Sequence, residues 1–313
     1  MSKPEVLMIG PYPAWDMEDL EGRYVIHRLW EAEDRAGFLA SHADGIRAIA
    51  TRGELGASAD LMKALPNLEI VSCYGVGTDA IDLTFARDNK IRVTNTPDVL
   101  TEDVADLGMA LMLAAARQLP AGDAYVRDGS WAQGNMGLTT RVCGKRVGVV
   151  GMGRIGAAFA RRAAAFDCPI SYFARTPKPD LNYTFVDDLV ELARQSDFLV
   201  ITLAGGEGTR GSVSAEVIEA LGPGGILVNI SRGTTVDEAA LLDALEQGRI
   251  RGAGLDVFLN EPRIDPRFAA LQNVALQPHH GSGTVETRQA MGKLVRDNLA
   301  AHFAGRPLLT PVV

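Results

Sequence analysis

Cysteine is scarce in this sequence of 313 residues, and its pattern argues against a disulfide framework. The three cysteines, Cys73, Cys143 and Cys168, are odd in number and form no C-x-x-C pair. This usage favours a reducing, cytoplasmic setting, because disulfides persist in oxidising compartments. Cys73 lies near a glycine-rich loop, but a buried spectator thiol explains it better than a nucleophile does.

Basic residues and long apolar runs are also lacking. The 31 lysines and arginines are outnumbered by 39 aspartates and glutamates, and no basic cluster stands out. We therefore expect no nucleic-acid partner, and an anionic substrate would need a local positive site. The longest apolar stretch, residues 109–116, is too short to cross a bilayer. The N-terminal apolar run is typical of a strand rather than a signal peptide, so no membrane partner is expected.

Short apolar runs alternate with segments of helical period. A first set of predicted strands comprises residues 6–10, 46–51, 68–75 and 91–96. A second set comprises residues 145–151, 169–174, 198–204, 225–231, 252–258 and 273–278. Strands that are apolar throughout and separated by helices indicate parallel sheets covered on both faces. The length and the two sets of strands together predict two α/β domains.

Two long amphipathic helices are expected to join these domains. One covers residues 96–119, with Thr101 as its N-cap, and the other covers residues 284–305. A cleft between two α/β domains is a common place for a small-molecule site. The loop at residues 11–17 has no recognisable signature. Its Tyr12 and Trp15 either shape a substrate pocket or pack at the surface.

The segment from Gly151 to Gly156 reads G-x-G-x-x-G between a predicted strand and a predicted helix. In that setting the glycines permit a tight turn, a close approach to a pyrophosphate and close packing of helix on strand. The helix N-terminus then stabilises the anion. The segment predicts dinucleotide binding. A glycine turn without a ligand and a methyltransferase loop are the alternatives.

The next strand ends in YFARTPKP, without the acidic residue that usually contacts the ribose hydroxyls of NAD. Ala174 stands in its place and Arg175 follows, with Thr176 and Lys178 nearby. Loss of the carboxylate removes repulsion of a 2′-phosphate, and an arginine can bind a phosphate through two hydrogen bonds. The pattern favours NADP(H), with NAD(H) as a second cofactor. A solvated turn with a chance arginine is the alternative.

Three further segments each follow a predicted strand, where ligands gather in open α/β sheets. They are NISRG at 229–233, LDVFLNEP at 255–262 and QPHHGSG at 277–283. An arginine so placed can hold a carboxylate, and a glutamate can stabilise a protonated histidine that donates to a carbonyl oxygen. A surface arginine, a loop glutamate and a capping histidine are the alternatives.

Together and in this order, these motifs resemble the D-isomer-specific 2-hydroxyacid dehydrogenase family. The similarity extends to YGVGTDAID (74–82) and VTNTPDVLTEDVADL (93–107). KRVGVVGMGRIG, FDCPISYFAR, GSGTVETR and PLLTPVV most resemble the hydroxyphenylpyruvate and hydroxypyruvate (glyoxylate) reductases within it. The segment GGEGTRG (205–211) departs from the family, whose members commonly have a proline-containing sequence there. That departure puts the adenine side of the cofactor loop in doubt.

The resemblance implies two Rossmann-like domains with parallel sheets. A flavodoxin-like substrate domain would comprise residues 1–99 and 285–313, and an NAD(P)-binding domain residues 100–284. Carried over residue by residue, the family pattern makes Arg232 the group that binds and activates the substrate. Glu261 becomes the partner of His279, the proton donor, and His280 fills a variable position. A Glu261 out of reach of His279 would contradict this assignment.

The remaining contacts follow from the same resemblance. The backbone of Val76 and Gly77 would hold the substrate carboxylate together with Arg232, and His279 would bind the substrate as its proton donor. The implied cofactor-binding residues are Gly151, Met152, Gly153, Arg154, Ile155, Ala174, Arg175, Thr176, Ile230, Ser231, Asp256, Gly281 and Ser282. No metal is implied.

The resulting hypothesis is an NADPH-preferring reductase that converts 2-oxoacids to D-2-hydroxy acids. Hydroxypyruvate and glyoxylate are its leading substrates, and arylpyruvates are further candidates. The resemblance also implies a homodimer, formed through the long helices and residues 129–138, where Trp131 would be exchanged between subunits. A non-catalytic, nucleotide-sensing protein on the same scaffold is the alternative function, and turnover would distinguish the two.

Overall fold

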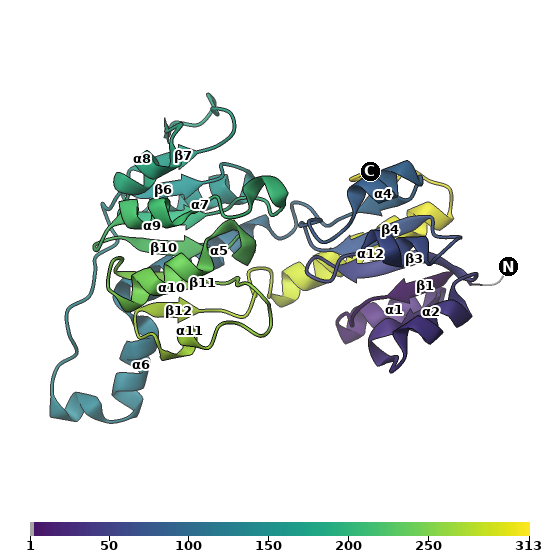
Figure 1. The fold of residues 1–313 in the computed structure, drawn as a ribbon, viewed down its shortest axis with the longest axis horizontal. Coiled ribbons are helices and arrows are strands. Elements are labelled where there is room, and N and C mark those ends of the chain that lie inside the picture. Colours follow the sequence, from purple (N-terminus) through teal and green to yellow (C-terminus); the bar gives the residue numbers. More distant parts are fainter. Residues whose placement is uncertain (1–2) are drawn as a thin grey trace. The chain divides into compact units, whose positions relative to one another are not determined.

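The computed structural model describes residues 3–313, and the chain forms two compact units. The first unit contains the chain up to Leu100 and the segment Ser282–Val313. The second unit is the continuous segment Thr101–Gly281. Residues 1–2 of the predicted substrate domain lie outside the residues that the structure describes. Figure 1 shows a parallel sheet flanked by helices within each unit.

The sheet of the first unit has five parallel strands in the order β2-β1-β3-β4-β5. The strands are β1 Glu5–Met8, β2 Val25–Arg28, β3 Ile46–Arg52, β4 Ile70–Tyr74 and β5 Arg92–Thr94. This order is that of the flavodoxin-like doubly wound fold. The predicted fold class is therefore confirmed for this unit, although the sequence pattern did not indicate β2.

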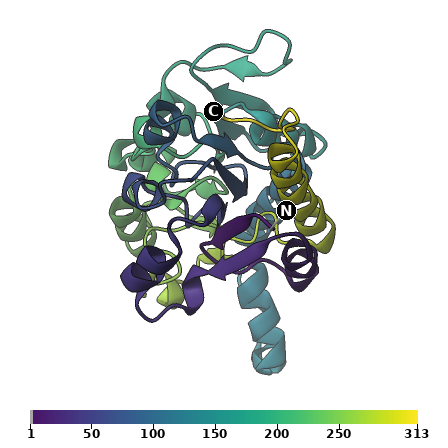
Figure 2. The ribbon, with the colours of Figure 1, turned by 90° about the vertical axis from the view of Figure 1, so that its right-hand side faces the viewer.

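Helices cover both faces of this sheet. They are α1 Ala14–Arg23, η1 Leu29–Glu31, α2 Arg35–His42, α3 Ala59–Lys63, α4 Leu83–Asp88 and α12 Val285–Phe303. In Figure 2, α1 and α12 lie side by side on one face, and the two helices are in contact. On the other face, Met62, Leu65 and Ala86 pack with Leu7, Ile49 and other strand residues into one buried core. The carboxyl ends of the strands are thereby held at one edge of a rigid sheet.

The sheet of the second unit has seven parallel strands in the order β12-β11-β10-β9-β6-β7-β8. The strands are β6 Val147–Val150, β7 Ile170–Phe173, β8 Thr184–Phe185, β9 Phe198–Ile201, β10 Ile226–Asn229, β11 Gly252–Leu255 and β12 Val274–Leu276. Renumbered within this sheet, the order is 3-2-1-4-5-6, with one further strand beyond the sixth. That is the dinucleotide-binding order, which confirms the predicted Rossmann-like fold.

The helices of the second unit cover its sheet and supply its protruding segment. They are α5 Thr101–Arg117, α6 Leu119–Arg127, η2 Ser130–Gln133, α7 Arg154–Ala164, α8 Leu189–Arg194, η3 Glu207–Thr209, α9 Ala215–Leu221, η4 Gly233–Thr235, α10 Glu238–Glu246 and α11 Arg267–Ala270. Figure 1 shows α6 and the loop after it standing away from the sheet of this unit. Among residues 3–313, no helix has both the length and the apolar character needed to span a membrane.

One expected helix boundary was wrong. Residues 96–100 precede α5 as irregular structure, and Thr101 is the first helical residue rather than the N-cap. The reason is Asp98, whose φ of 68° is left-handed. A single left-handed residue cannot continue a right-handed helix, so α5 begins only after it.

Candidate active site

The three glycines of the G-x-G-x-x-G segment each have a separate structural reason. Gly151 has a φ of +100°, and a Cβ there would lie 3.0 Å from backbone atoms of Thr202 and Leu203. A Cβ on Gly156 would collide with the carbonyl oxygen of Gly151, so this glycine permits α7 to pack against the loop. A Cβ on Gly153 would have no atom within 4 Å. The second glycine thus faces open space, as a loop that admits a pyrophosphate requires.

The turn after β7 lies directly beside this glycine loop, because the N–H of Gly151 donates to the carbonyl of Phe173 at 2.8 Å. Ala174, Arg175 and Thr176 follow Phe173 immediately. The buried Tyr172 fixes the far side of the turn, since its hydroxyl accepts a hydrogen bond from the N–H of Lys178 at 2.7 Å.

Arg175 is exposed, and no hydrogen bond or ion pair within residues 3–313 engages its guanidinium. Thr176 and Lys178 are exposed as well, whereas Ala174 is half-buried. The turn therefore presents a cation and a hydroxyl at the edge of the glycine loop, without a carboxylate at the position of Ala174.

Ile230 and Ser231 continue from β10 toward the same loop. The N–H of Ile230 donates to the carbonyl of Ile201 at 3.3 Å, and the hydroxyl of Ser231 donates to the carbonyl of Leu203 at 2.6 Å. Leu203 is one of the two residues whose backbone lies 3.0 Å from the Cβ position of Gly151. The predicted contacts at 151–155 and 230–231 therefore share one edge of the sheet.

Arg232 follows at the end of β10 and is half-buried. Its carbonyl accepts hydrogen bonds from the side chains of Asn229 at 3.0 Å and Thr235 at 2.7 Å, which hold its backbone in place. Gly233 is required beside it, because a Cβ there would collide with the backbone of Phe258 and Leu259. The close approach at Gly233 brings the Arg232 loop against the loop that follows β11.

That second loop carries Glu261, and Glu261 contacts His279. Nδ1 of His279 lies 2.6 Å from Oε2 of Glu261, whose Oε1 accepts the N–H of Phe258 at 2.7 Å. Burial raises the pKa of Glu261, but the hydrogen bond and charge of His279, the N–H of Phe258 and the charge of Arg232 together hold that pKa below its ordinary value. The carboxylate is therefore ionised at neutral pH, and it contacts the imidazole of His279.

Asp256 fixes the turn at residues 279–281 through hydrogen bonds. Its side chain accepts the N–H groups of His280 at 2.6 Å and Gly281 at 2.9 Å, and its carbonyl accepts the N–H of His279 at 2.8 Å. Burial raises the pKa of this carboxyl above its ordinary value, and the hydrogen bonds from the turn oppose that shift. His279 adopts a left-handed φ of 52°, a conformation uncommon outside glycine, and Asp256 makes it tenable.

The two neighbouring histidines have different surroundings. His279 is half-buried against Glu261, whereas His280 is exposed. The other three histidines form separate contacts in the first unit: His27 with Glu5, His42 with the carbonyl of Phe38, and His302 with Glu69. Of the five histidines, only His279 contacts Glu261, whose pKa the charge of Arg232 also helps to lower.

The strand order explains why Arg232, Glu261 and His279 meet. They follow β10, β11 and β12, which are adjacent in the sheet and parallel. Because parallel strands end at one edge, loops up to 47 residues apart in the sequence converge there. A cation, an ionised carboxylate and an imidazole in this arrangement can bind an anionic substrate, polarise a carbonyl and supply a proton.

Sequence reasoning missed one buried charge beside this group. Glu238, at the start of α10, accepts the N–H of Leu259 at 2.8 Å and so contacts the loop that carries Glu261. Burial raises the pKa of Glu238, and the charges of Asp265 and Glu261 raise it further. Acidic residues are common in the first turn of helices, so the sequence gives no sign that this glutamate contacts the loop of Glu261.

The predicted carboxylate loop belongs to the first unit, directly after β4. Gly75, Val76 and Gly77 form it, and Val76 is exposed. Tyr12 is buried below this loop, with its hydroxyl donating to the carbonyl of Thr51 at 2.7 Å and its ring against Tyr74. Tyr12 therefore contributes to the packing around the loop. Of the last two predicted cofactor residues, Gly281 ends the second unit and Ser282 begins the 282–313 segment of the first.

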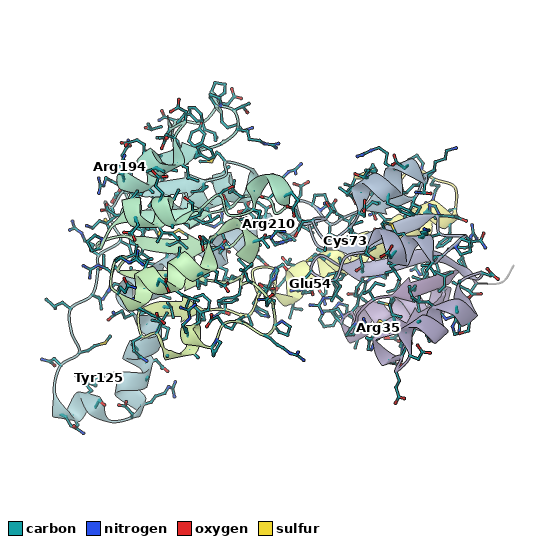
Figure 3. All side chains as sticks on the ribbon, viewed as in Figure 1. Arg35, Glu54, Cys73, Tyr125, Arg194 and Arg210 are labelled. Carbon is teal, nitrogen blue, oxygen red and sulfur yellow. The ribbon has the colours of Figure 1, made fainter. Side chains whose placement is uncertain are left out.

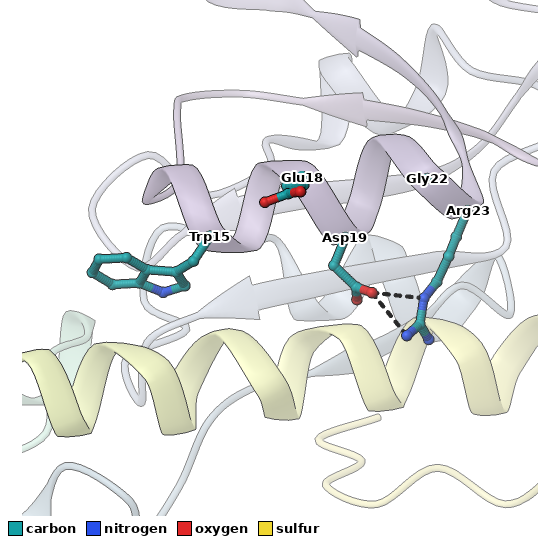
Figure 4. A pocket seen from close by; sticks show the side chains of 5 residues that line it. All are labelled: Trp15, Glu18, Asp19, Gly22 and Arg23. Atoms are coloured by element: carbon teal, nitrogen blue, oxygen red, sulfur yellow. Dashed lines mark hydrogen bonds and ion pairs between the residues drawn. The ribbon is translucent and has the colours of Figure 1, made fainter.

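A surface hollow of about 480 Å³ lies on the first unit and contains none of the predicted site residues. Figure 4 shows Trp15, Glu18, Asp19 and Arg23 around it on α1, with α12 alongside. Asp19 and Arg23 form an ion pair at 2.8 Å across one turn of α1. Trp15 thus lies at this hollow, which has no arrangement of groups suited to proton transfer.

Within residues 3–313, no cluster of three or more histidine, cysteine, aspartate or glutamate side chains could hold a metal ion. None of the three cysteines forms a disulfide. The departure at 205–211 folds into a compact turn containing η3, in which the Thr209 hydroxyl donates to the carbonyl of Ala204 at 2.7 Å. Arg210, labelled in Figure 3, pairs there with Glu207 at 2.8 Å.

A dinucleotide-binding sheet with this glycine loop, and an arginine, a glutamate and a histidine at adjacent strand ends, define a nicotinamide-dependent dehydrogenase. The chain belongs to the D-isomer specific 2-hydroxyacid dehydrogenase family, whose NAD binding domain model matches residues 109–281. It is thus an NAD(P)-dependent oxidoreductase that acts on CH–OH donors.

Characterised relatives match over almost the whole chain. Hydroxyphenylpyruvate reductase of Plectranthus scutellarioides is 52% identical over 308 residues, covering 98% of both chains. Glyoxylate/hydroxypyruvate reductase A of Arabidopsis thaliana is 51% identical over 308 residues, and this match also covers 98% of both chains. The 2-ketogluconate reductase of Gluconobacter oxydans is 45% identical over 312 residues, covering 100% of this chain and 99% of its own.

Solved structures agree with this placement. A 2-hydroxyacid dehydrogenase from Ketogulonicigenium vulgare is 59% identical with a TM-score of 0.93, covering 100% of this chain and 99% of its own. An NADPH-dependent glyoxylate/hydroxypyruvate reductase from Sinorhizobium meliloti, in complex with NADP and malonate, is 41% identical with a TM-score of 0.92. That match covers 100% of this chain and 97% of the other.

Proposed function

We propose that this chain reduces 2-oxoacids to D-2-hydroxy acids and prefers NADPH to NADH. Hydroxypyruvate and glyoxylate are its proposed main substrates, with arylpyruvates as further ones. The observation that carries the proposal is the contact between His279 and Glu261, at strand ends adjacent to the one that Arg232 follows.

The cofactor preference rests on the turn after β7. Arg175 is exposed beside the glycine loop with no partner among the described residues, and Ala174 replaces the carboxylate that would contact the ribose hydroxyls of NAD. An arginine can bind a phosphate through two parallel hydrogen bonds, so a 2′-phosphate would be stabilised there. The NADPH-dependent relative from Sinorhizobium meliloti supports the same preference.

The proposed chemistry divides between cofactor and side chains. The nicotinamide, when bound, supplies the hydride. Arg232 binds the substrate carboxylate and polarises the adjacent carbonyl. His279 donates a proton to the carbonyl oxygen, and the ionised Glu261 stabilises the protonated imidazole and fixes which ring nitrogen faces the substrate. We also assign the N–H groups of Val76 and Gly77 to the substrate carboxylate.

The substrate range is proposed from relatives with different substrates. Proteins of 45% to 52% identity are named for hydroxyphenylpyruvate, for glyoxylate and hydroxypyruvate, and for 2-ketogluconate. Their common feature is a 2-oxo carboxylate, the group that Arg232 and the 76–77 loop are proposed to bind. The side chain of the substrate is therefore the variable part.

We further propose a homodimer formed through α6 and the loop after it. Trp131 is 64% exposed and Val126 is 58% exposed, and the side chain of Leu138 lies open to solvent. Figure 3 labels Tyr125 in the same protruding segment, where its hydroxyl donates to the carbonyl of Gly134 at 3.0 Å. Exposed large apolar residues gathered on one protruding segment are typical of a protein interface. A second copy of the chain would cover them.

The experiment that tests the function is product analysis. Hydroxypyruvate is incubated with NADPH and the chain, and the glycerate formed is resolved by chiral chromatography. We expect D-glycerate in amounts equal to the NADPH consumed. L-glycerate would contradict the assigned stereochemistry. Absence of turnover with any 2-oxoacid, despite binding of NADPH, would favour the nucleotide-sensing alternative.

A further inference from the structure

The loop formed by Gly75, Val76 and Gly77 is held by its three carbonyl groups. The carbonyl of Gly75 accepts the N–H of Thr96 at 2.9 Å. The carbonyl of Val76 accepts Nδ2 of Asn95 at 2.9 Å, and that of Gly77 accepts the thiol of Cys73 at 3.5 Å. These bonds use only the acceptors of the loop. Its N–H groups are the part that can serve an anion.

Asn95 is itself held by a segment 215 residues further along the chain. The hydroxyl of Thr310 donates to the carbonyl of Asn95 at 2.6 Å, and the N–H of Asn95 donates to the carbonyl of Thr310 at 3.4 Å. Residues 309–313 run antiparallel beside β5, where Val93 exchanges hydrogen bonds with Val312 and Val313 at 2.7 and 3.1 Å. This segment therefore pairs with the edge strand that leads into Asn95.

The direction of the Thr310 hydroxyl is determined by Asn298 on α12. Asn298 is fully buried, and its Nδ2 lies 2.9 Å from Oγ1 of Thr310. Its Oδ1 accepts the N–H groups of Leu309 at 2.9 Å and Thr310 at 3.2 Å. Because an amide nitrogen only donates, Oγ1 accepts a hydrogen bond from Asn298, and its own O–H donates to the backbone carbonyl of Asn95. The hydrogen bonds thus run from the amide of Asn298 to the hydroxyl of Thr310, and from that hydroxyl to the backbone carbonyl of Asn95.

We propose that Thr310 and Asn95 are positioning residues for substrate binding: the 309–313 segment holds Asn95, and Asn95 holds Val76 so that the loop's N–H groups meet the substrate carboxylate. The proposal rests on the function proposed above and adds a role for a segment remote in sequence from every predicted site residue. Neither residue is proposed to touch the substrate.

The physical consequence is a change in binding rather than in chemistry. Backbone N–H groups bind the substrate carboxylate equally well before and during hydride transfer. Loss of that interaction therefore raises KM and leaves kcat largely unchanged. One hydrogen bond to a charged group contributes on the order of tenfold in affinity. We therefore expect Asn95→Ala and Thr310→Val to raise the KM for hydroxypyruvate about five- to tenfold.

The variants are made in the full chain and assayed for hydroxypyruvate and NADPH separately. Thr310→Val removes the hydroxyl at nearly constant volume, and Thr310→Ser should restore the parent KM. Asn95→Asp keeps the shape of Asn95 but replaces its donor, so it serves if Asn95→Ala does not fold. The double variant Asn95→Ala/Thr310→Val should be no worse than Asn95→Ala alone, because Thr310 is proposed to act on the Val76 carbonyl only through Asn95.

Asn67→Ala is the matched control. Nδ2 of Asn67 donates to the carbonyl of Asp44 at 2.9 Å in the same unit, so the substitution removes the same type of bond away from the 75–77 loop. Oxamate, which carries the same carboxylate, is the binding probe, and its inhibition constant should rise in parallel with the KM for hydroxypyruvate. The KM for NADPH should stay at the parent value.

The outcomes separate the two proposals. The positioning role would be overturned if the KM for hydroxypyruvate stayed unchanged both in the Asn95 variant, whether Ala or Asp, and in Thr310→Val. It would also be overturned if Asn67→Ala raised that KM by the same factor. A fall in kcat with constant KM would also overturn it. A parent chain that reduces no 2-oxoacid would instead overturn the proposed function, and the positioning role with it.

Discussion

Nδ1 of His279 lies 2.6 Å from Oε2 of Glu261, and this contact joins the loops that follow β12 and β11. The second oxygen of Glu261 is occupied by the N–H of Phe258. The carboxylate is thus fixed in its own loop and orients the imidazole. The charge of Arg232 also helps to lower the pKa of this carboxyl group.

Glu261→Gln should weaken both catalysis and acid-dependent stability. The glutamine cannot stabilise a protonated imidazole by charge, so kcat/KM should fall about 10- to 100-fold. The pKa of Glu261 is lower in the folded state than its ordinary value of 4.5. Its contribution to stability is therefore present above that value and lost as pH falls through the folded pKa.

Urea unfolding of the parent and the Glu261→Gln variant measures this contribution. The parent should be the more stable at pH 7, and the difference should narrow as the pH falls below about 4.5. A difference that stays constant from pH 7 to pH 3 would show that the ionised carboxylate contributes nothing to folding.

His279→Gln should lose about 10²- to 10⁴-fold in kcat, the range associated with loss of a general acid. NADPH binding, followed by fluorescence titration, should stay within twofold of the parent, a margin that corresponds to about 0.4 kcal/mol. His280→Gln is the matched control, because His280 is adjacent, exposed and bonded to Asp256 only through its backbone. Equal losses in the two variants would remove the distinction drawn between the neighbouring histidines.

The sequence predicted most of the second unit for a simple reason. Its strands are buried on both faces, so each gives a continuous apolar run, and the G-x-G-x-x-G segment identifies the first βα turn. The edge strands β2 and β8 were not indicated. β2 contains His27 and Arg28, and β8 has only two residues, so neither forms an apolar run.

Side-chain contacts between residues far apart in the chain could not be predicted from the sequence pattern. The bond from Thr310 to Asn95 joins residues 215 positions apart, and no spacing rule connects a threonine near the end of the chain to a loop near residue 76. Gly233 was recognised only as part of S-R-G. Its reason, contact with the backbone of Phe258 and Leu259, depends on the packing of two strand ends.

Arg175→Ala should lower the preference for NADPH. Loss of a bidentate partner for the 2′-phosphate should raise the KM for NADPH about tenfold or more, with little effect on NADH. Arg194→Ala on α8 removes another exposed arginine of the same unit and should leave the KM values for NADPH and NADH unchanged (Figure 3). Equal KM values for NADPH in the parent and in Arg175→Ala would remove Arg175 from the cofactor site.

Trp131→Glu should convert the proposed homodimer to a monomer. A charge in the centre of an apolar interface is desolvated without a partner, which costs several kcal/mol. Analytical ultracentrifugation of the parent and variant measures the change. Trp15→Glu, at the hollow on α1, is the control and should leave the mass of the assembly unchanged. A parent that sediments as a monomer of 33.4 kDa would contradict the dimer itself.

The central claim is that Arg232, Glu261 and His279 reduce a 2-oxoacid with hydride from NADPH. The most direct test is the initial rate of NADPH oxidation with hydroxypyruvate, measured for the parent and for Arg232→Ala and repeated with NADH. We predict fast oxidation of NADPH by the parent, slower oxidation of NADH, and loss of most of kcat/KM in Arg232→Ala. A near-normal kcat/KM in Arg232→Ala would contradict the account.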